Sequence, residues 1–135
     1  MDRADARYAR NAGAVFSLKY HAVWCPKYRR PVLVGAVAIR LDALIREAAD
    51  LRGMRVHALE VMPDHVHLFV ETDPRWAPAA VTGQIKANTS RVLRAEFPAL
   101  RSRLPTLWSR SYFIATTGAV SETAIRRYIE AQKGR

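Results

Sequence analysis

The 135-residue sequence contains a single cysteine and no long hydrophobic run. A lone cysteine, Cys25, excludes an internal disulfide and any zinc site built from cysteines, and it fits a reducing compartment. No apolar stretch approaches the roughly 20 residues that a membrane-spanning helix needs. The first dozen residues are charged and alanine-rich, without the apolar centre of a signal peptide. We therefore expect a cytoplasmic protein with no membrane partner.

Acidic residues are also scarce. The chain has 12 Asp and Glu against 22 Lys and Arg, which gives a formal net charge of +10 and a pI near 10.6. A compact domain with this charge repels itself unless an anionic partner binds, and nucleic acid is the leading candidate. A basic surface without such a partner is the simpler alternative. Half of the residues are hydrophobic, which excludes a disordered chain.

The apolar pattern predicts an α+β domain. Alternating apolar residues predict strands over residues 14–24, 54–62, 65–71 and 107–118. Helical spacing predicts helices over residues 35–52 and 78–97 and a short helix capped by Ser121, with a loop between Pro98 and Pro105. This order is that of the ferredoxin-like βαββαβ arrangement, a four-stranded antiparallel sheet whose first and third strands are central, followed by an extra C-terminal helix. Both crossover helices cover one face of such a sheet, and the other face is open.

The chain shows no linker that would divide it. We expect residues 1–13 to form a flexible N-terminal arm and residues 14–135 to form one domain.

Two of the four histidines, His65 and His67, lie one residue apart in the apolar stretch VMPDHVHLFV. Residues two apart on a strand share a face, so both imidazoles are expected on the open face of the sheet. Their bases would lie about 7 Å apart, close enough for both rings to reach one divalent ion. A pair of surface histidines explains the same pattern, so this strand alone does not decide between the two.

The residues around this pair are assigned ordinary roles. Asp64 is expected to be a turn residue rather than a metal ligand. His21 is expected on the neighbouring central strand, on the same open face, as a half-exposed histidine. His57 has no companion that the pattern identifies, and no function is assigned to it.

The C-terminal stretch AIRRYIEAQKGR places Ile125, Tyr128, Ile129 and Gln132 on one helical stripe, with Tyr128 and Gln132 one turn apart. An ordinary amphipathic helix explains this segment by itself. Together with two imidazoles, an amide oxygen would give an ion three neutral ligands and leave its charge free for phosphate oxygens. The phenol, with a pKa of ~10, would be a nucleophile whose phenolate can also leave, which favours a reversible phosphotyrosine bond over hydrolysis.

Four stretches resemble the TnpA-like single-tyrosine HUH transposases of insertion sequences that transpose as single-stranded DNA. They are YHAVWCPKYRRPVLVG, VMPDHVHLFV, LWSRSYFIATTG and YIEAQ, in the family's order and spacing. The resemblance implies that His65, His67 and Gln132 are ligands of Mg²⁺ or Mn²⁺ and that Tyr128 is the catalytic nucleophile. Ala87 departs from the family pattern, in which glycine often follows the lysine at this place.

The resemblance also implies a reaction and partners. Such an enzyme cleaves and rejoins single-stranded DNA at element ends through a 5′-phosphotyrosine intermediate, recognises imperfect subterminal hairpins and needs no nucleotide cofactor. It is an obligate homodimer in which the tyrosine helix of one subunit can complete the histidine site of the other, and DNA binding would bring it to the nucleoid. Basic residues suited to phosphate contacts are Lys27, Arg29, Arg30, Lys86, Arg91 and Arg94, each equally explained as a solvated charge.

Two alternatives remain open. One is a domesticated transposase that acts on repeated extragenic palindromes, and the other is a catalytically silent hairpin-DNA-binding protein. The intact tyrosine, glutamine and histidines argue against the silent protein. The sequence leaves undecided the hairpin sequence, the cleavage or target tetranucleotide, the metal, completion of the site in cis or in trans, and the mobility of the element.

Overall fold

A computed structural model describes residues 8–11, 13–118 and 120–135 of the chain. The strands are β1 (Ala9–Arg10), β2 (Val15–Phe16), β3 (Leu18–Trp24), β4 (Arg55–Met62), β5 (His65–Thr72) and β6 (Phe113–Thr116). The helices are the short turn η1 (Lys27–Arg29), α1 (Gly35–Leu51), α2 (Pro78–Glu96), α3 (Pro98–Arg103) and α4 (Glu122–Ala131).

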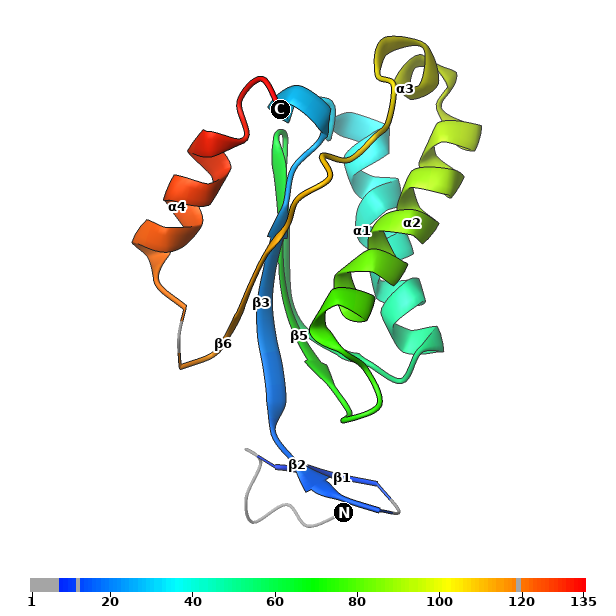
Figure 1. Cartoon of the computed structure of the whole chain (residues 1–135). Coiled ribbons are helices and arrows are strands. Elements are labelled where there is room, and N and C mark those ends of the chain that lie inside the picture. Colours follow the sequence, from blue (N-terminus) through cyan, green and yellow to red (C-terminus); the bar gives the residue numbers. More distant parts are fainter. Residues whose placement is uncertain (1–7, 12, 119) are drawn as a thin grey trace.

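The main sheet has four strands in the order β4-β5-β3-β6, and every neighbouring pair is antiparallel. Strands β3 and β5, the first and third strands that the sequence predicts for this sheet, form its centre. Helices α1 and α2 cover one face, and α4 lies on the opposite side (Figure 1). The predicted α+β fold with its additional C-terminal helix is therefore confirmed.

The core lies between the sheet and the first two long helices. Its largest members alternate along the central strands and recur at helical spacing, as the sequence pattern predicts. From the strands it includes Tyr20, Ala22, Trp24, Val66, Leu68 and Val70, and from the helices Leu41, Leu44, Ile45, Val81, Ile85 and Leu93. Because this face of β5 takes the apolar side chains, the alternate residues of the strand are left for the other face.

Three predicted boundaries are wrong. The expected strand over residues 14–24 is divided into β2, which pairs with β1, and β3, which belongs to the main sheet. The expected loop between Pro98 and Pro105 contains helix α3, which begins at Pro98, where a fixed φ and a missing N–H suit a first helical residue. The expected fourth strand over residues 107–118 narrows to β6, and Trp108 makes only an isolated bridge to Pro26. Between Trp108 and β6, the carbonyls of Ser109 and Ser111 accept hydrogen bonds from a side chain, as described below.

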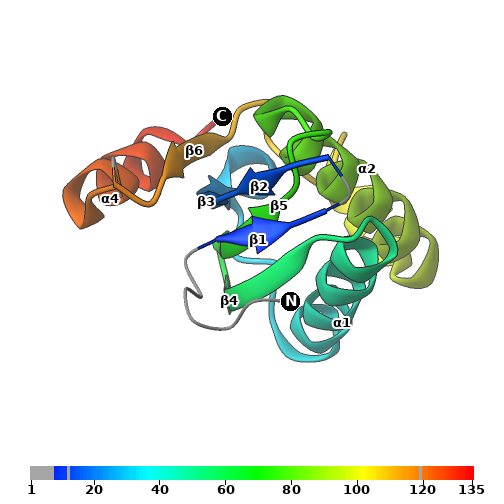
Figure 2. The same cartoon turned by 90° about the horizontal axis from the view of Figure 1, so that it is seen from below.

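The N-terminal segment forms a small sheet of its own. Strands β1 and β2 pair antiparallel at one end of the main sheet, in front of it in the view of Figure 2. Most of the predicted arm, residues 1–7 and 12, lies outside the described residues, and the division of the chain into arm and domain stays a prediction. In the part of the chain that the structure describes, no helix has the length and apolarity needed to cross a bilayer.

Candidate active site

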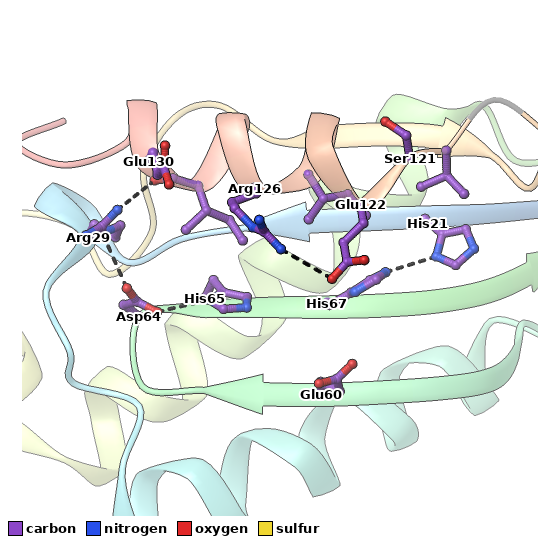
Figure 3. Close-up of a pocket in the computed structure, with 13 residues that line it drawn as sticks. His21, Arg29, Glu60, Asp64, His65, His67, Ser121, Glu122, Arg126 and Glu130 are labelled. Atoms are coloured by element: carbon purple, nitrogen blue, oxygen red, sulfur yellow. Dashed lines mark hydrogen bonds and ion pairs between the residues drawn. The ribbon is translucent and has the colours of Figure 1, made fainter.

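His65 and His67 lie half-buried on the face of β5 that points away from α1 and α2 (Figure 3). Strand β3 adds a third imidazole to this face, because His21 lies opposite Phe69 in the register of the central pair. Its ring stacks on Phe69 with centroids 4.4 Å apart, and His21 Nδ1 lies 2.9 Å from His67 Nε2. One of these two rings must donate the proton of that hydrogen bond, since a neutral imidazole has one N–H.

Burial keeps two imidazoles of this face, those of His67 and His21, uncharged. It lowers the pKa of His67, and the neighbouring His21 lowers that pKa further. Burial alone lowers the pKa of His21. Both rings are therefore neutral at pH 7, which is the form of histidine that can bind a metal ion.

His65 is oriented by the turn before it. Its Nδ1 lies 2.9 Å from Oδ1 of Asp64, and Oδ2 of Asp64 forms an ion pair with Nε of Arg29 at 3.3 Å. A carboxylate beside Nδ1 favours the tautomer with its proton there, so that Nε2 has its lone pair available. Asp64 is the turn residue that the sequence predicts, and it also orients a candidate ligand.

A cavity of about 670 Å³ separates this histidine face from α4 (Figure 3). Its volume falls in the ordinary range of ligand sites. The side chains that line it from the sheet and its loops are His21, Arg29, Glu60, Asp64, His65 and His67. Those that line it from α4 and the residues before it are Val120, Ser121, Glu122, Ile125, Arg126, Ile129 and Glu130.

Helix α4 begins where the sequence predicts. The Ser121 hydroxyl accepts a hydrogen bond from the N–H of Ala124 at 3.1 Å, and Glu122 lies in the positive first turn. The single stripe that the sequence suggests is divided in the structure. Ile125 and Ile129 face the cavity, whereas Tyr128 and Gln132 point toward the segment before β6.

Tyr128 and Gln132 bind two serines, Ser109 and Ser111, which we call the serine cradle. Ser111 Oγ donates to Gln132 Oε1 at 2.9 Å and lies 2.8 Å from the hydroxyl of Tyr128. Because Ser111 has only one hydroxyl proton, the phenol must be the donor in the second bond. Gln132 is 5% exposed, accepts a further bond from Ser109 Oγ at 3.4 Å, and donates from Nε2 to the carbonyl of Tyr128.

The phenol in the cradle is protonated. Burial raises the pKa of Tyr128 to about 12. Its ring also packs against Phe113 of β6, with centroids 6.0 Å apart. The structure thus brings Tyr128 and Gln132 together, and it brings His65 and His67 together. Neither Tyr128 nor Gln132 lines the cavity that the two histidines line.

Lys86 binds the backbone of the serine cradle. Its Nζ donates to the carbonyls of Ser109 and Ser111 at 2.8 and 3.0 Å, while the N–H of Ser109 donates to the carbonyl of Cys25 at 2.9 Å. The indole of Trp108 donates in turn to the carbonyl of Lys86 at 3.1 Å. Burial lowers the pKa of Lys86 to about 8. A lysine predicted from sequence as a phosphate contact therefore has an internal role in the structure.

Other predicted phosphate contacts also have partners inside the chain. Arg94 donates to the carbonyl of Pro105 at 3.1 Å, and Arg91 donates to the side chain of Asn88 at 3.0 Å. Lys27 lies over the ring of Tyr28, 5.3 Å from its centroid. Arg30 is exposed. Whether these residues also meet DNA stays a prediction.

His57 has a partner that the sequence pattern did not reveal. Its Nε2 lies 2.8 Å from Oε1 of Glu71 on β5, and its ring approaches Phe69 with centroids 5.3 Å apart. The pairing of β4 with β5 shifts between Val56 and Ala58, which makes His57 the extra residue of a β-bulge. A bulge turns a side chain away from its alternating position, and strict alternation has no signal for it.

The two histidines are compatible with a metal ion but do not by themselves supply a third ligand. His65 and His67 offer two neutral imidazoles on one strand face, which suits a divalent ion. Within residues 8–11, 13–118 and 120–135, no group of three or more His, Cys, Asp or Glu side chains is placed to hold a metal. A third ligand must therefore be of another type or come from elsewhere, and the amide of Gln132 is the candidate that the sequence supplies.

Comparison with known proteins gives concordant matches. The family model described as "Transposase IS200 like" matches residues 14–132. The ISDra2 transposase TnpA of Deinococcus radiodurans is 39% identical over 122 residues, which cover 89% of this chain and 87% of that protein. The transposase of insertion sequence element IS200 from Salmonella typhimurium is 28% identical over 119 residues, covering 87% of this chain and 78% of its own.

Two solved structures share the fold. A crystal structure of a candidate transposase from Deinococcus radiodurans R1 superposes with a TM-score of 0.84 at 35% identity, covering 94% of this chain and 99% of the other. A REP-associated tyrosine transposase bound to a REP hairpin superposes with a TM-score of 0.55 at 14% identity, covering 96% of this chain and 69% of the other. The second likeness concerns the fold alone.

Proposed function

Because this chain belongs to the IS200-like family of transposases, a family of HUH tyrosine transposases, we propose that it cleaves and rejoins single-stranded DNA at the ends of an insertion sequence. The reaction would pass through a 5′-phosphotyrosine intermediate on Tyr128. His65, His67 and Gln132 would hold Mg²⁺ or Mn²⁺. The observation that supports this proposal most is the oriented histidine pair, which faces the tyrosine helix across a cavity of ligand size.

The chain's own groups divide the chemistry between them. A divalent ion, when bound, would polarise the scissile phosphate and stabilise the charge that develops on it. The phenol oxygen of Tyr128 attacks phosphorus and loses its proton, while the bond from phosphorus to the 3′ oxygen breaks and the 3′-hydroxyl leaves with a proton. The reverse attack by a 3′-hydroxyl on the phosphotyrosine rejoins the strands. No ATP is required, because the covalent bond retains the energy of the cleaved one.

Tyr128 must leave the serine cradle before it can react. In the cradle its phenol is protonated and lies outside the histidine cavity. Helix α4 lies beside β6 at the edge of the sheet (Figure 2), and β6 pairs only with β3 among the described strands. We propose a homodimer that forms next to this edge, in which the tyrosine helix of one subunit completes the histidine site of the other.

The proposed substrate is single-stranded DNA that carries an imperfect hairpin. A net charge of +10 favours a polyanionic partner, and the REP-associated structure of similar fold is described with a hairpin bound. Basic side chains near the cavity and the cradle would contact phosphates and set the orientation of the strand. Binding of this kind would bring the protein to the nucleoid.

The proposal is tested by adduct formation. Purified protein is incubated with Mn²⁺ and a labelled single strand from an element end, and a protein–DNA band that survives denaturation is the expected product. Tyr128→Phe should bind the strand and form no adduct. Tyr112→Phe, a control at the residue that follows Ser111 in the sequence, should still form it. EDTA should abolish the band. An adduct formed by Tyr128→Phe would remove Tyr128 as the nucleophile.

The same assay separates the two alternatives. A domesticated enzyme would react with dispersed extragenic palindromes and not with element ends. A silent hairpin-binding protein would retard the strand without any cut product, in agreement with a phenol that stays in its cradle.

A further inference from the structure

We propose that Arg29 is a positioning residue that connects the tyrosine helix to the metal-ligand histidine. One guanidinium contacts Asp64, which orients His65, and also contacts the last turn of α4 (Figure 3). The inference deepens the proposed function and rests on it for the role of His65 as a ligand.

The first contact concerns His65. Asp64 binds His65 through Oδ1 and Arg29 through Oδ2, so the two oxygens of one carboxylate serve two partners. The side chains of Arg29 and Asp64 are only 23% and 31% exposed, which limits the screening of this ion pair by solvent. Groups that orient a metal-ligating histidine through its second nitrogen affect metal affinity although they do not touch the ion. Arg29 would act one step further out, by fixing the carboxylate.

The second contact concerns the helix. Nη1 of Arg29 donates to the carbonyl of Ile129 at 3.2 Å, in the last turn of α4. The carbonyl of Ile129 also accepts the N–H of Gln132 at 3.1 Å. Carbonyls at this end of a helix carry the negative end of the helix dipole, so a cation there is favourable. The backbone adds to the contact, because the N–H of Gly134 donates to the carbonyl of Tyr28 at 3.4 Å.

The backbone of the turn is strained where these contacts are made. Tyr28 and Arg29 have φ of 62° and 53°, in the left-handed region that residues with a Cβ rarely adopt. Two such residues in succession persist only when the surrounding contacts hold them. The contacts of Arg29 with Asp64 and with α4 are of this kind. The strain therefore indicates that the direction of the Arg29 side chain matters, which a freely solvated phosphate contact would not require.

The consequence is a coupling between the two halves of the site. While α4 lies over its own cavity, Arg29 is shared between the helix and Asp64. When α4 leaves, the same guanidinium keeps Asp64 as its partner and continues to orient His65. Loss of Arg29 should therefore weaken metal binding and also loosen the end of the helix.

The experiment compares Arg29→Gln with Arg30→Gln, which removes an exposed arginine from the next position of the same loop. The dissociation constant of Mn²⁺ is measured from the electron paramagnetic resonance signal of the free ion. We expect a rise of about tenfold for Arg29→Gln and less than about twofold for Arg30→Gln. Arg29→Lys should behave like Arg29→Gln, because an ammonium cannot reproduce the fork that reaches both partners; circular dichroism checks that each variant is folded.

Amide hydrogen exchange without metal tests the helix half. The last turn of α4 should exchange faster in Arg29→Gln than in wild type, and Arg30→Gln should match wild type. Asp64→Asn should weaken Mn²⁺ binding while leaving this turn protected, because the bond from Arg29 to Ile129 does not need the carboxylate.

Unchanged Mn²⁺ affinity in Arg29→Gln, together with equal losses of DNA binding in Arg29→Gln and Arg30→Gln, would overturn the proposal and make Arg29 a phosphate contact. A wild-type protein that binds no Mn²⁺ would contradict the proposed function and with it the metal half of the inference. Hydrogen exchange would then still decide the helix half.

Discussion

Strand β5 and helix α4 hold their functional side chains in different ways. Strand β5 is central, pairs with β3 and β4 over nearly its whole length, and has a fully buried apolar face behind its histidines. Helix α4 lies at the sheet edge, has no fully buried residue within its bounds, and makes hydrogen bonds to the serine cradle and Arg29. The strand that carries the histidines is thus part of the core, whereas the helix that carries Tyr128 packs on the outside of the sheet.

The energies of these attachments differ accordingly. Burial of one large apolar side chain contributes about 1.5–3 kcal/mol, and β5 contributes several to the core. A hydrogen bond in the native state contributes about 0.5–1.5 kcal/mol net, and α4 makes a few. Segments held in this second way open at free energies well below that of global unfolding. The proposed site, which would need a fixed metal position and a moving nucleophile, would have both in one chain.

The largest expected effect separates the two faces of β5. Leu68→Ala removes a fully buried side chain and should lower the free energy of unfolding by about 2–5 kcal/mol. His67→Ala, one residue away on the open face, should lower it by less than about 1 kcal/mol and yet abolish metal-dependent cleavage. Urea denaturation and the adduct assay measure the two effects. Cleavage that persists in His67→Ala would remove this residue from the ligand set.

The next prediction compares β5 with α4 directly. Amide hydrogens of α4 should exchange at least about 100-fold faster than those of the centre of β5, because the helix opens without global unfolding. Exchange measured by mass spectrometry on peptides from residues 65–72 and 122–131 tests this. Equal protection of both segments would mean that α4 is part of the cooperative core, and the proposed movement of the tyrosine would lose its basis.

The strand half of the site was predictable from sequence because its determinants are local and periodic. Alternation along β5 assigns Val66 and Leu68 to the core and therefore places His65 and His67 on the opposite face, as the structure has them. Ser121 is a local signal of the same kind, and it caps α4 as predicted.

The remaining contacts join distant segments of the chain, and no local pattern encodes them. Lys86 and Ser111 are 25 positions apart, and Arg29 and Ile129 are 100 positions apart. The bulge at His57 breaks the alternation that the prediction relies on. The position of Tyr128 away from the histidines also could not be derived, because helical spacing gives the stripe but not the neighbour against which it packs.

A smaller effect is expected at the serine cradle. Ser111→Ala removes the partner of the Tyr128 hydroxyl and the main donor to the buried amide of Gln132. Leaving such groups unpaired costs about 1–2 kcal/mol, so α4 should exchange roughly tenfold faster while β5 is unchanged. Ser102→Ala, on the exposed surface of α3, is the matched control and should alter neither segment. Unchanged exchange of α4 in Ser111→Ala would show that the cradle does not hold the helix.

The smallest effect is a pH dependence contributed by Lys86 beneath the cradle. Burial lowers the pKa of this lysine from the ordinary value of 10.5 to about 8, so between pH 8 and 10.5 the unfolded chain binds more protons than the folded chain. Unfolding free energy must then rise with pH across this window, and the cost of burying the charge is fully present below pH 8. After allowance for solvent screening the rise should be about 1 kcal/mol.

Urea denaturation of wild type and Lys86→Met at pH 7.5 and 10 isolates this contribution. The advantage of wild type over Lys86→Met should grow as pH increases, because the neutral amine can still donate to the carbonyls of Ser109 and Ser111 without the penalty of a buried charge. Lys133→Met, which removes an exposed lysine, should keep the wild-type pH dependence. If the advantage of wild type shrinks with pH instead, the two carbonyl acceptors stabilise the ammonium more than burial disfavours it. The charged form of Lys86 would then stabilise the serine cradle.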